Sequence, residues 1–306
     1  MWHVLVGERL ISLPALALCG LGIGVIAGMF GIGGGFLLTP ILHLIFKLPM
    51  PIAVGSALCQ KIGTSIASFL KHRQYRHGEL RVDWIMLGAS LLGVDAGTRL
   101  LTWLSDAGTF TNAAGRPVSI VTITLDVCYA AMLLFAASMT VNAVRKGATD
   151  KRRSAVGSRL SAPALVRVRV PPYVGLPSVG IESVSVTVMA YIGFATGLLS
   201  GLLGIGGGVA MLPVLVYGYG FSIRDAAGTG ILLLFANVLV GTFEHALRGN
   251  VDLRVALAVL AGSSIGSQIG ARATARLSSQ TLRVSFAALL LFTVGAIGVD
   301  VVRSLS

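Results

Sequence analysis

The stretch that decides the fold is GVIAGMFGIGGGFLLTPIL at residues 24–42, and it returns as GLLSGLLGIGGGVAMLPVL at residues 197–215. In each copy an apolar segment runs into the glycine cluster GIGGG, and a proline follows after four more residues. Successive glycines unwind a helix at low steric cost, and proline removes a backbone donor. At membrane depth, unwound backbone is tolerated only where protein covers it or a wet cavity borders it. The pattern predicts two broken helices that serve either a binding site or close helix packing.

The rest of the sequence repeats together with these two stretches. A shift of 173 residues matches the chain to itself without a gap over about 75 residues. The matched pairs include Pro40 with Pro213, Gly55 with Gly228, His72 with His245, Arg81 with Arg254, and Arg99 with Arg272. Glycine abundance alone would not place histidine, proline and arginine in one register. We therefore predict a duplicated unit.

Composition places most of the chain in lipid. Hydrophobic residues make up 55% of the sequence, charged residues make up 12%, and the mean hydropathy is +0.85. A soluble chain of this length would need more polar surface. Eight apolar blocks can be read, at residues 13–46, 52–70, 82–104, 118–144, 184–217, 226–246, 252–273 and 282–302. We predict an all-α polytopic membrane protein with about eight hydrophobic segments in two homologous four-segment repeats.

The first block of each repeat is too long for one upright helix. As helices, residues 13–46 and 184–217 would each reach about 50 Å, against a hydrocarbon core of about 30 Å. We expect each block to be broken or re-entrant at GIGGG. Re-entrant blocks would give each half an odd number of crossings and an inverted pair of repeats, whereas single crossings would give a parallel pair. Counting Lys and Arg does not separate these arrangements, and we favour the inverted one.

A basic segment at residues 145–182 separates the repeats. It contains eight Lys and Arg residues and four prolines, against two acidic residues. This composition is typical of a flexible linker, and its charge favours the cytoplasm. A regulatory site or a site for anionic lipid is the alternative. The chain thus divides into an N-terminal transmembrane repeat at residues 1–144, the linker, and a C-terminal transmembrane repeat at residues 183–306.

The net charge and the spacing of the cysteines limit the kinds of partner that we expect. A formal net charge of +12 would suggest nucleic acid in a soluble protein. Here the positive charge lies in connections between apolar blocks, where it sets topology, so we expect no nucleic-acid partner. The three cysteines have neither metal-ligand nor disulfide spacing. We predict no metal and no cofactor. The expected partners are the lipid bilayer and a small anionic substrate, and a homo-oligomer stays open.

The doubled G-x3-G-x2-GIGGG-x4-P-x-L element resembles the TauE/SafE family of sulfite-exporter-like permeases. Further resemblances are Gly55-Ser56 and Gly228-Thr229, which open the next blocks, and GxxxG-x-R at residues 93–99 and 266–272. The resemblance covers most of the chain outside the linker, which is long for this family. It implies a multi-pass permease of the bacterial inner membrane for sulfite, sulfonates or other sulfur-containing organic anions.

Lys61 is the charged residue with the clearest candidate role. It lies centrally in the second block, where a cation is costly and usually faces a cavity or a partner. Its repeat equivalent is Leu234, so it is not a shared scaffold residue. One interpretation is a counter-charge for an anionic substrate, and the other is a buried ion pair with Asp95 or Asp126.

The other candidate substrate contacts are glycine backbone and polar side chains. Backbone amides freed by the helix breaks attract anions. The predicted substrate-binding residues are Gly33, Gly34, Gly35, Ser56, Gln60, Lys61, Gly206, Gly207, Gly208, Thr229 and Asn237. Pro40 and Pro213 are the predicted hinges at the helix breaks. His72 and His245 end their blocks and could couple protons, although histidine at a membrane interface is more often without such a role. For Arg99 and Arg272, snorkelling is favoured over anion binding.

These residues lead to one leading function and two alternatives. The leading hypothesis is an anion permease that works by alternating access at the repeat interface and is proton-coupled in one version. A transition-metal or other cation permease would need clustered His, Cys, Met or carboxylate groups within the membrane. A membrane enzyme or assembly factor would need a reactive constellation. The sequence reveals no catalytic constellation, so we expect no enzyme.

Overall fold

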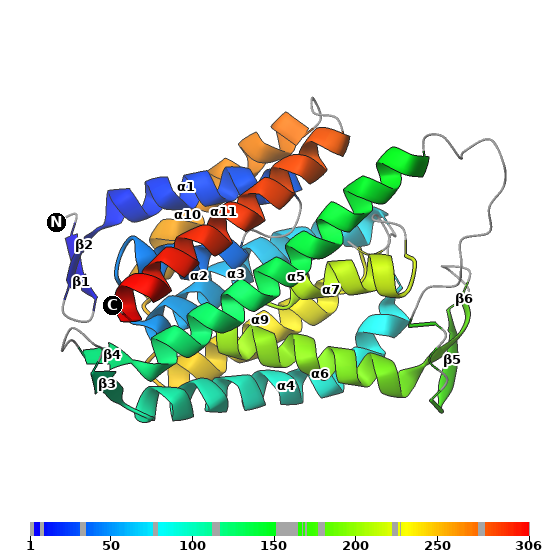
Figure 1. Ribbon diagram of the computed structural model, residues 1–306, viewed down its shortest axis with the longest axis horizontal. Coiled ribbons are helices and arrows are strands. Elements are labelled where there is room, and N and C mark those ends of the chain that lie inside the picture. Colours follow the sequence, from blue (N-terminus) through cyan, green and yellow to red (C-terminus); the bar gives the residue numbers. More distant parts are fainter. Residues whose placement is uncertain are drawn as a thin grey trace.

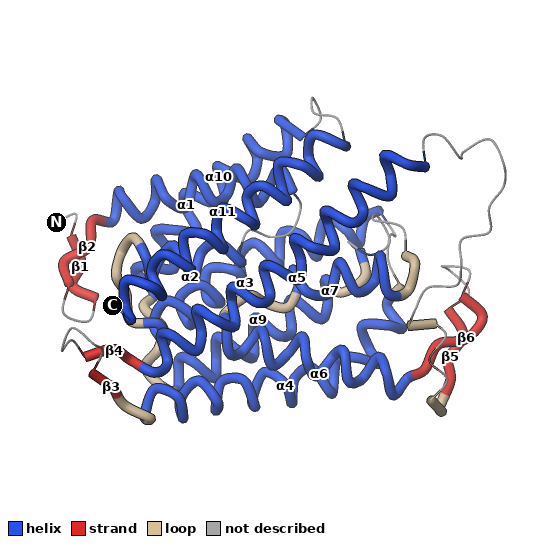
Figure 2. Tube along the Cα trace, viewed as in Figure 1, coloured by secondary structure: helices blue, strands red, loops and turns tan. Residues whose placement is uncertain are grey.

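The protein is a bundle of long helices with short β-hairpins at its two ends (Figures 1 and 2). The computed structural model describes residues 3–6, 9–30, 35–75, 79–111, 117–150, 165–166, 168, 170–176, 181–221, 226, 228–274 and 279–305. The sequence pattern does not predict the hairpins. They are β1 (His3–Val6) with β2 (Arg9–Ser12), β3 (Thr109–Thr111) with β4 (Pro117–Ser119), and β5 (Tyr173–Leu176) with β6 (Ile181–Ser185).

The helices repeat in the same order in the two halves. The first half contains α1 (Leu13–Phe30), α2 (Gly35–Leu44), α3 (Met50–Tyr75), α4 (Leu80–Asp106) and α5 (Ile120–Asp150). The second half contains α6 (Val186–Leu203), α7 (Gly208–Pro213) with a π-helical turn at Val214–Gly218, α9 (Ile231–Leu247), α10 (Leu253–Thr274) and α11 (Ser279–Leu305). A break separates α1 from α2, and a second break separates α6 from α7. A hairpin precedes the first helix of each half.

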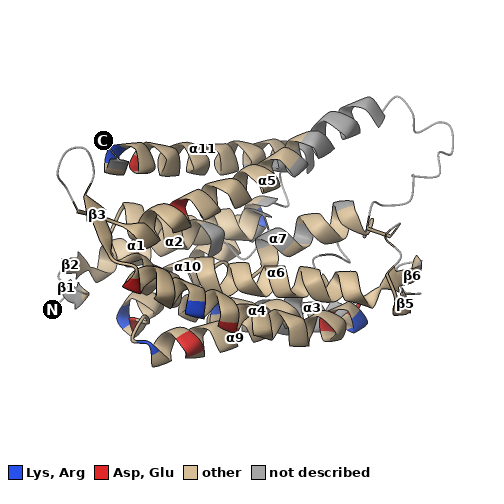
Figure 3. Ribbon diagram, turned by 60° about the horizontal axis from the view of Figure 1, so that its bottom comes forward, with Lys and Arg blue, Asp and Glu red and all other residues tan. Residues whose placement is uncertain are grey.

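The helical membrane class is confirmed. Within the described residues, five helical stretches are long and apolar enough to cross a membrane: Leu80–Asp106, Ile120–Ser138, Val186–Leu203, Leu253–Gly270 and Ala287–Ser304. Shorter apolar helices cover Leu13–Met29 and Leu232–Leu247. α3 has 26 residues, but Gln60 and Lys61 interrupt its apolar part. In Figure 3, α6 carries no charged residue along its length.

α1 and α10 pack backbone to backbone along a glycine seam. A Cβ at each seam glycine would overlap the facing backbone, so only glycine allows this approach. The contacts pair Gly20 with Val259, Gly24 with Ser263, and Gly28 with Ser267. Because the residue numbers rise together, α1 and α10 are parallel.

An equivalent seam joins α6 to α4. Its contacts pair Gly193 with Met86, Gly197 with Ser90, and Gly201 with Val94. α4 and α6 are therefore parallel as well. The first helix of each half thus packs against the fourth helix of the other half, and each half contributes one helix to each seam.

The contacts of α3 give the relative direction of the two halves. α3 is parallel to α10, because Gly55 contacts Asn250 and Gln60 contacts Ser263 farther along both helices. It is antiparallel to α9, because Gly55 also meets His245, whereas Leu58 meets the earlier Gly241. α9 follows the direction of α4, since the contacts run from Asp83 with Gly230 to Ser90 with Asn237.

The equivalent helices α1 and α6 therefore run in opposite directions. α1 and α3 point the same way with only α2 between them, so α2 turns back at the glycine break. Figure 1 agrees, because the hairpins that precede α1 and α6 lie at opposite ends of the bundle. Besides the two seams, the halves also meet along α3 with α9 and along α5 with α11.

The predicted linker is partly built into the fold. α5 continues to Asp150, and β5 begins at Tyr173, so both ends of residues 145–182 contain regular structure. The backbone N–H of Leu165 donates to the carbonyl oxygen of Gly218, at 3.1 Å, which attaches the segment to the second broken helix. The remainder, including residues 151–164 and 177–180, lies outside the described residues. The described parts of the segment thus contain helix and strand, and the linker assignment stays a prediction.

Candidate functional site

The break between α6 and α7 is an unwound stretch that requires glycine. Gly204, Gly206 and Gly207 have φ values of 71°, 76° and 80°, in the left-handed region that other residues rarely adopt. A Cβ at Gly204 would lie 2.9 Å from the Val54 carbonyl oxygen. The GIGGG pattern therefore reflects both backbone conformation and close approach from α3. Among the described residues, no acceptor is seen for the backbone N–H groups of Gly206 and Gly207.

Lys61 reaches this break from α3. Only 3% of the residue is exposed, and its ammonium group donates a hydrogen bond to the carbonyl oxygen of Gly204. Its aliphatic chain lies beside Gly206. The last carbonyl groups of a helix have no partner within the helix and carry partial negative charge. A cation is therefore well placed at the end of α6.

The two carboxylates considered as partners of Lys61 are engaged elsewhere. Asp95 accepts from Arg99 on the next turn of α4, at 2.9 Å. Asp126 lies with His43 and Asp300. Within the described part of the chain, Lys61 forms no ion pair, so the buried-pair interpretation is wrong there. The ammonium group is held by a neutral carbonyl, which an anion can replace.

Tyr129 holds the preceding carbonyl group. This residue of α5 is fully buried, and its hydroxyl donates to the carbonyl oxygen of Leu203. Thr39 of α2 also lies beside Gly204. Two consecutive carbonyls at the end of α6 are thus held by side chains from the other half of the molecule. The repeat does not predict Tyr129, because the gapless match ends before α5.

Several buried polar atoms around α6 have no protein partner among the described residues. They are the Asn237 amide nitrogen Nδ2, the Ser200 hydroxyl and the His245 Nδ1 atom. Asn237 faces the break, since a Cβ at Gly207 would lie 3.4 Å from its Nδ2, and its Oδ1 accepts from Ser90 at 2.8 Å. A buried polar group without a partner costs about 1–3 kcal/mol. A polar ligand at the break would offset part of this cost.

The predicted ligands Ser56 and Thr229 form a matched pair of contacts elsewhere. The Ser56 hydroxyl accepts from the backbone N–H of Asp252, at 3.0 Å, and the Thr229 hydroxyl accepts from that of Glu79, at 2.9 Å. Asp252 and Glu79 cap the first turns of α10 and α4 with their own carboxylates. Ser56 and Thr229 thus hold equivalent helix starts across the two halves. Their role in substrate binding stays a prediction.

Other predicted residues are placed as follows. Gln60 donates to the Ser263 hydroxyl at 2.8 Å, on the α10 side of α3. Gly35 begins α2 and Gly208 begins α7. Pro40 lies within α2, and Pro213 ends α7 where the π-helical turn begins. Gly33 and Gly34 lie outside the described residues.

Of the two predicted proton-coupling histidines, the structure describes the side chain of His245 only. His245 is fully buried although it lies in the last turn of α9, and its Nε2–H donates to the Gly201 carbonyl oxygen at 2.9 Å. It therefore belongs to the packed end of α6 and not to an exposed interface. His72 lies in α3, and its side chain is outside the described part.

Comparison with known proteins identifies the family. The family described as "Sulfite exporter TauE/SafE" matches residues 16–297, which span both halves and both breaks. The chain belongs to the TauE/SafE family. As a TauE/SafE protein, it is a multi-pass membrane transporter. No solved structure matches it significantly.

Its curated relatives carry general names. This TauE/SafE chain is 24% identical over 278 residues to the probable membrane transporter protein YunE of Bacillus subtilis, covering 89% of this chain and 92% of that protein. It is 24% identical over 254 residues to the probable membrane transporter protein YdhB of the same organism, covering 82% and 86%. It is 25% identical over 291 residues to a probable membrane transporter protein of Haemophilus influenzae, covering 88% and 91%. These names state transport and leave the cargo open.

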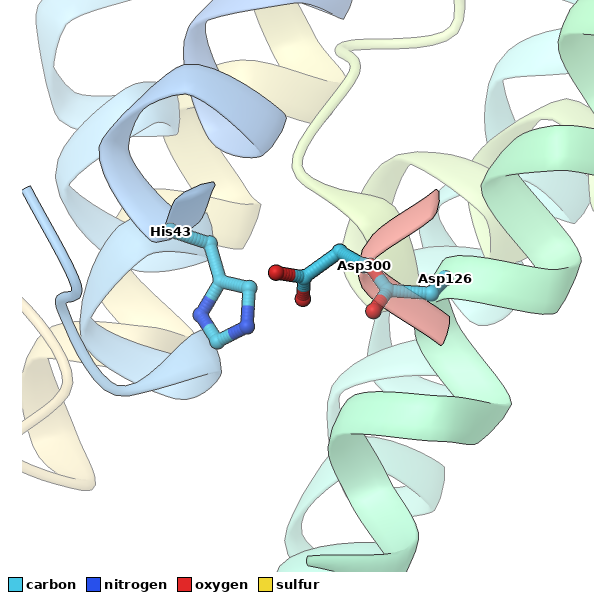
Figure 4. A group of neighbouring side chains, drawn as sticks. All are labelled: His43, Asp126 and Asp300. Carbon is cyan, nitrogen blue, oxygen red and sulfur yellow. The ribbon is translucent and has the colours of Figure 1, made fainter. Parts of the chain in front are cut away.

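This TauE/SafE chain also has a polar cluster that the sequence does not predict. His43 of α2, Asp126 of α5 and Asp300 of α11 each bring a polar atom within 4.8 Å of the other two (Figure 4). Asp300 lies between the histidine ring and Asp126 and also accepts from Lys47 at 3.3 Å. The three elements are far apart in the sequence, so no spacing signal could reveal the cluster.

Proposed function

We propose that this protein is a permease of the bacterial inner membrane for a small anion, with sulfite, sulfonates and other sulfur-containing organic anions as the substrate class. The observation that carries the proposal is the buried Lys61 ammonium at the unwound GIGGG stretch, where the two halves meet. The printed family name supports the sulfur-containing class. In this proposal residues 145–182 lie on the cytoplasmic side, as their basic composition favours.

The site offers an anion three kinds of contact. Lys61 supplies the counter-charge, and an anion replaces the Gly204 carbonyl as the acceptor of its hydrogen bond. Asn237 supplies a donor through Nδ2, which lacks a protein partner in the described part. The backbone N–H groups of Gly206 and Gly207 supply further donors. Desolvating an anion is costly, and paired charge with several donors offsets that cost.

Alternating access needs two states of similar energy and a place that bends. Because the two halves run in opposite directions, they supply two related pathways, one toward each side of the membrane. Pro213 and the π-helical turn after it lie close to the second glycine break. We place the hinges at Pro40 and Pro213, beside the two GIGGG stretches, so that bending changes the position of Gly204 relative to Lys61.

The alternative of a transition-metal permease depends on the cluster of His43, Asp126 and Asp300. Two cations border that cluster, Lys47 through its ion pair and Arg303 in the adjoining groove. They oppose a divalent metal by charge repulsion. The anion proposal meets no such conflict, because Lys61 is the charged group at the glycine break.

The test is flux in proteoliposomes with radiolabelled sulfite, sulfoacetate and taurine. We expect saturable uptake of at least one of these anions, abolished by Lys61→Ala and partly retained by Lys61→Arg. Arg254→Gln is the matched control, because it removes a positive charge from an exposed position at the start of α10. Uptake that survives Lys61→Ala unchanged would remove Lys61 from the site. Absence of flux for all three anions, in protein shown to be folded, would contradict the substrate class.

A further inference from the structure

The cluster of His43, Asp126 and Asp300 is arranged to hold a small cation. The His43 Nδ1–H donates to the Leu48 carbonyl oxygen at 2.8 Å, so Nε2 is left as an acceptor on the ring. Asp126 is only 2% exposed, and the described residues give its carboxylate no hydrogen-bond donor. It points toward Asp300 (Figure 4). Two carboxylates and an imidazole acceptor therefore converge with no proton donor among the three groups.

The charge balance of the cluster calls for one more positive charge. With His43 neutral, Asp126 and Asp300 carry two negative charges, and Lys47 compensates one of them at 3.3 Å from Asp300. Adjacent carboxylates cannot both stay ionised in a poorly solvated site without a cation. A proton brings the cluster and Lys47 to neutrality, whereas a divalent ion would leave one excess positive charge.

The surrounding helices bring few other charged groups. α1, α6 and α7 contain no Asp, Glu, Lys or Arg. α4, which touches α5, uses Asp95 to pair with Arg99 and Asp83 to accept from the Gly230 N–H at 2.7 Å. Lys61 of α3 is held at the glycine break. Within the described structure, Lys47 is the cation that pairs with the cluster, and Arg303 borders the adjoining groove.

A surface groove gives the cluster an access route. It has a volume of about 750 Å³ and is bordered by Lys47, Asp300 and Arg303 together with apolar residues of α2 and α11. Asp300 thus lines the groove and also lies next to the buried Asp126. A proton entering from the groove would meet Asp300 first and Asp126 next.

Two helices connect the cluster to the glycine break. On α2, Thr39 lies beside Gly204 and His43 follows one turn later, on the same face. On α5, Tyr129 donates to Leu203 and Asp126 precedes it by one turn. Each helix therefore carries one residue at the cluster and one at the carbonyl groups next to Lys61.

We infer that His43, Asp126 and Asp300 form the binding site of the proton that is coupled to anion transport, an inference that rests on the proposed function. Loss of this proton leaves two facing carboxylates on α5 and α11, and their repulsion separates these helices. Tyr129 then moves with α5, and its hydrogen bond to the carbonyl oxygen of Leu203 changes. Binding the proton reverses these steps.

The experiment compares two kinds of flux in the same proteoliposomes. Uptake driven by an imposed pH gradient requires net proton movement, whereas exchange of internal for external substrate does not. For Asp126→Asn and Asp300→Asn we expect gradient-driven uptake to fall by about tenfold or more, with exchange comparable to wild type. Asp95→Asn is the matched control, because it makes the same change in an exposed ion pair of α4.

Each result of this experiment either supports or overturns the inference. Gradient-driven uptake that persists in both variants would overturn the inference, as would wild-type uptake that shows no response to an imposed pH gradient, and both results would leave the proposed function standing. Absence of wild-type exchange would overturn the proposed function and this inference with it. If a variant does not fold, infrared difference spectra of the wild type across pH apply, and a protonated carboxyl band is expected. Saturable Zn²⁺ binding by the wild type, with no such band, would overturn the proton assignment.

Discussion

The Lys61 ammonium donates its hydrogen bond to the carbonyl oxygen of Gly204, a residue 143 positions away in the other half of the chain. The contact joins a buried charge on α3 to the break that follows α6. Because the partner is a neutral backbone group, the charge stays available to an anion.

Gly206→Ala tests the conformation of the break. A Cβ is strained at φ 76° and would press on Val238. We expect the free energy of unfolding in detergent to fall by about 1–2 kcal/mol and anion flux to fall with it. Gly22→Ala is the control, since a Cβ at this α1 position meets no atom within 4 Å. Equal effects of the two substitutions would contradict the role given to the break.

Gly197→Ala tests the α4–α6 seam. The new Cβ would overlap the Ser90 backbone, so the helices must separate. We expect a loss of about 1–3 kcal/mol in stability, measured by thermal unfolding of the purified protein. Gly88→Ala on α4 has open space around it and should leave the melting temperature unchanged or slightly raised. If Gly197→Ala leaves the melting temperature unchanged, the α4–α6 seam is less tightly packed than described.

Ser56→Ala and Thr229→Val test the matched contacts across the two halves. Each removes one hydrogen bond to the start of a helix, and we expect each to lower the free energy of unfolding by about 1 kcal/mol. The two losses should be similar, because the contacts are equivalent. Stability unchanged with a raised KM for anion uptake would instead assign these hydroxyls to substrate binding.

Tyr129→Phe tests the second carbonyl contact. The substitution keeps the ring and removes the hydroxyl that donates to Leu203. An unpaired buried carbonyl costs about 1–3 kcal/mol, so we expect lower stability together with altered flux. Tyr173→Phe is the control, because that tyrosine is 48% exposed in β5. A similar result for the two tyrosines would argue against a specific role of Tyr129.

Asn237→Asp tests the donor that faces the break. The change replaces the Nδ2 donor with a carboxylate oxygen at nearly constant volume and places negative charge near the proposed anion. We expect KM for anion uptake to rise by about tenfold or more, with Asn250→Asp, at a half-buried position in the turn after α9, as a charge-matched control. An unchanged KM would exclude Asn237 from the substrate site.

The sequence predicts the class of fold well, because hydropathy, the repeat and the glycine breaks are local signals. It also points to Lys61, since a charge in an apolar block is conspicuous. The partner of Lys61 is not predictable in this way, because it is a backbone carbonyl group and not a residue type that the sequence pattern distinguishes. Tyr129 and Asp300 also escape prediction, since α5 and α11 lie outside the gapless repeat match, and Asp126 is predicted only as a possible partner of Lys61. Ser56 and Thr229 occupy equivalent repeat positions, and in the structure they make equivalent contacts at the starts of α10 and α4.

The seams that join α1 to α10 and α6 to α4 have a mechanical consequence. Helices whose backbones touch through glycine cannot slide or tilt apart without losing that contact, so each seam moves as one unit. Each unit contains helices from both halves of the chain. In the proposed alternating access, the moving bodies are therefore assembled across the duplication, with α3 beside α9 and α5 beside α11 as the surfaces where one body shifts against the other.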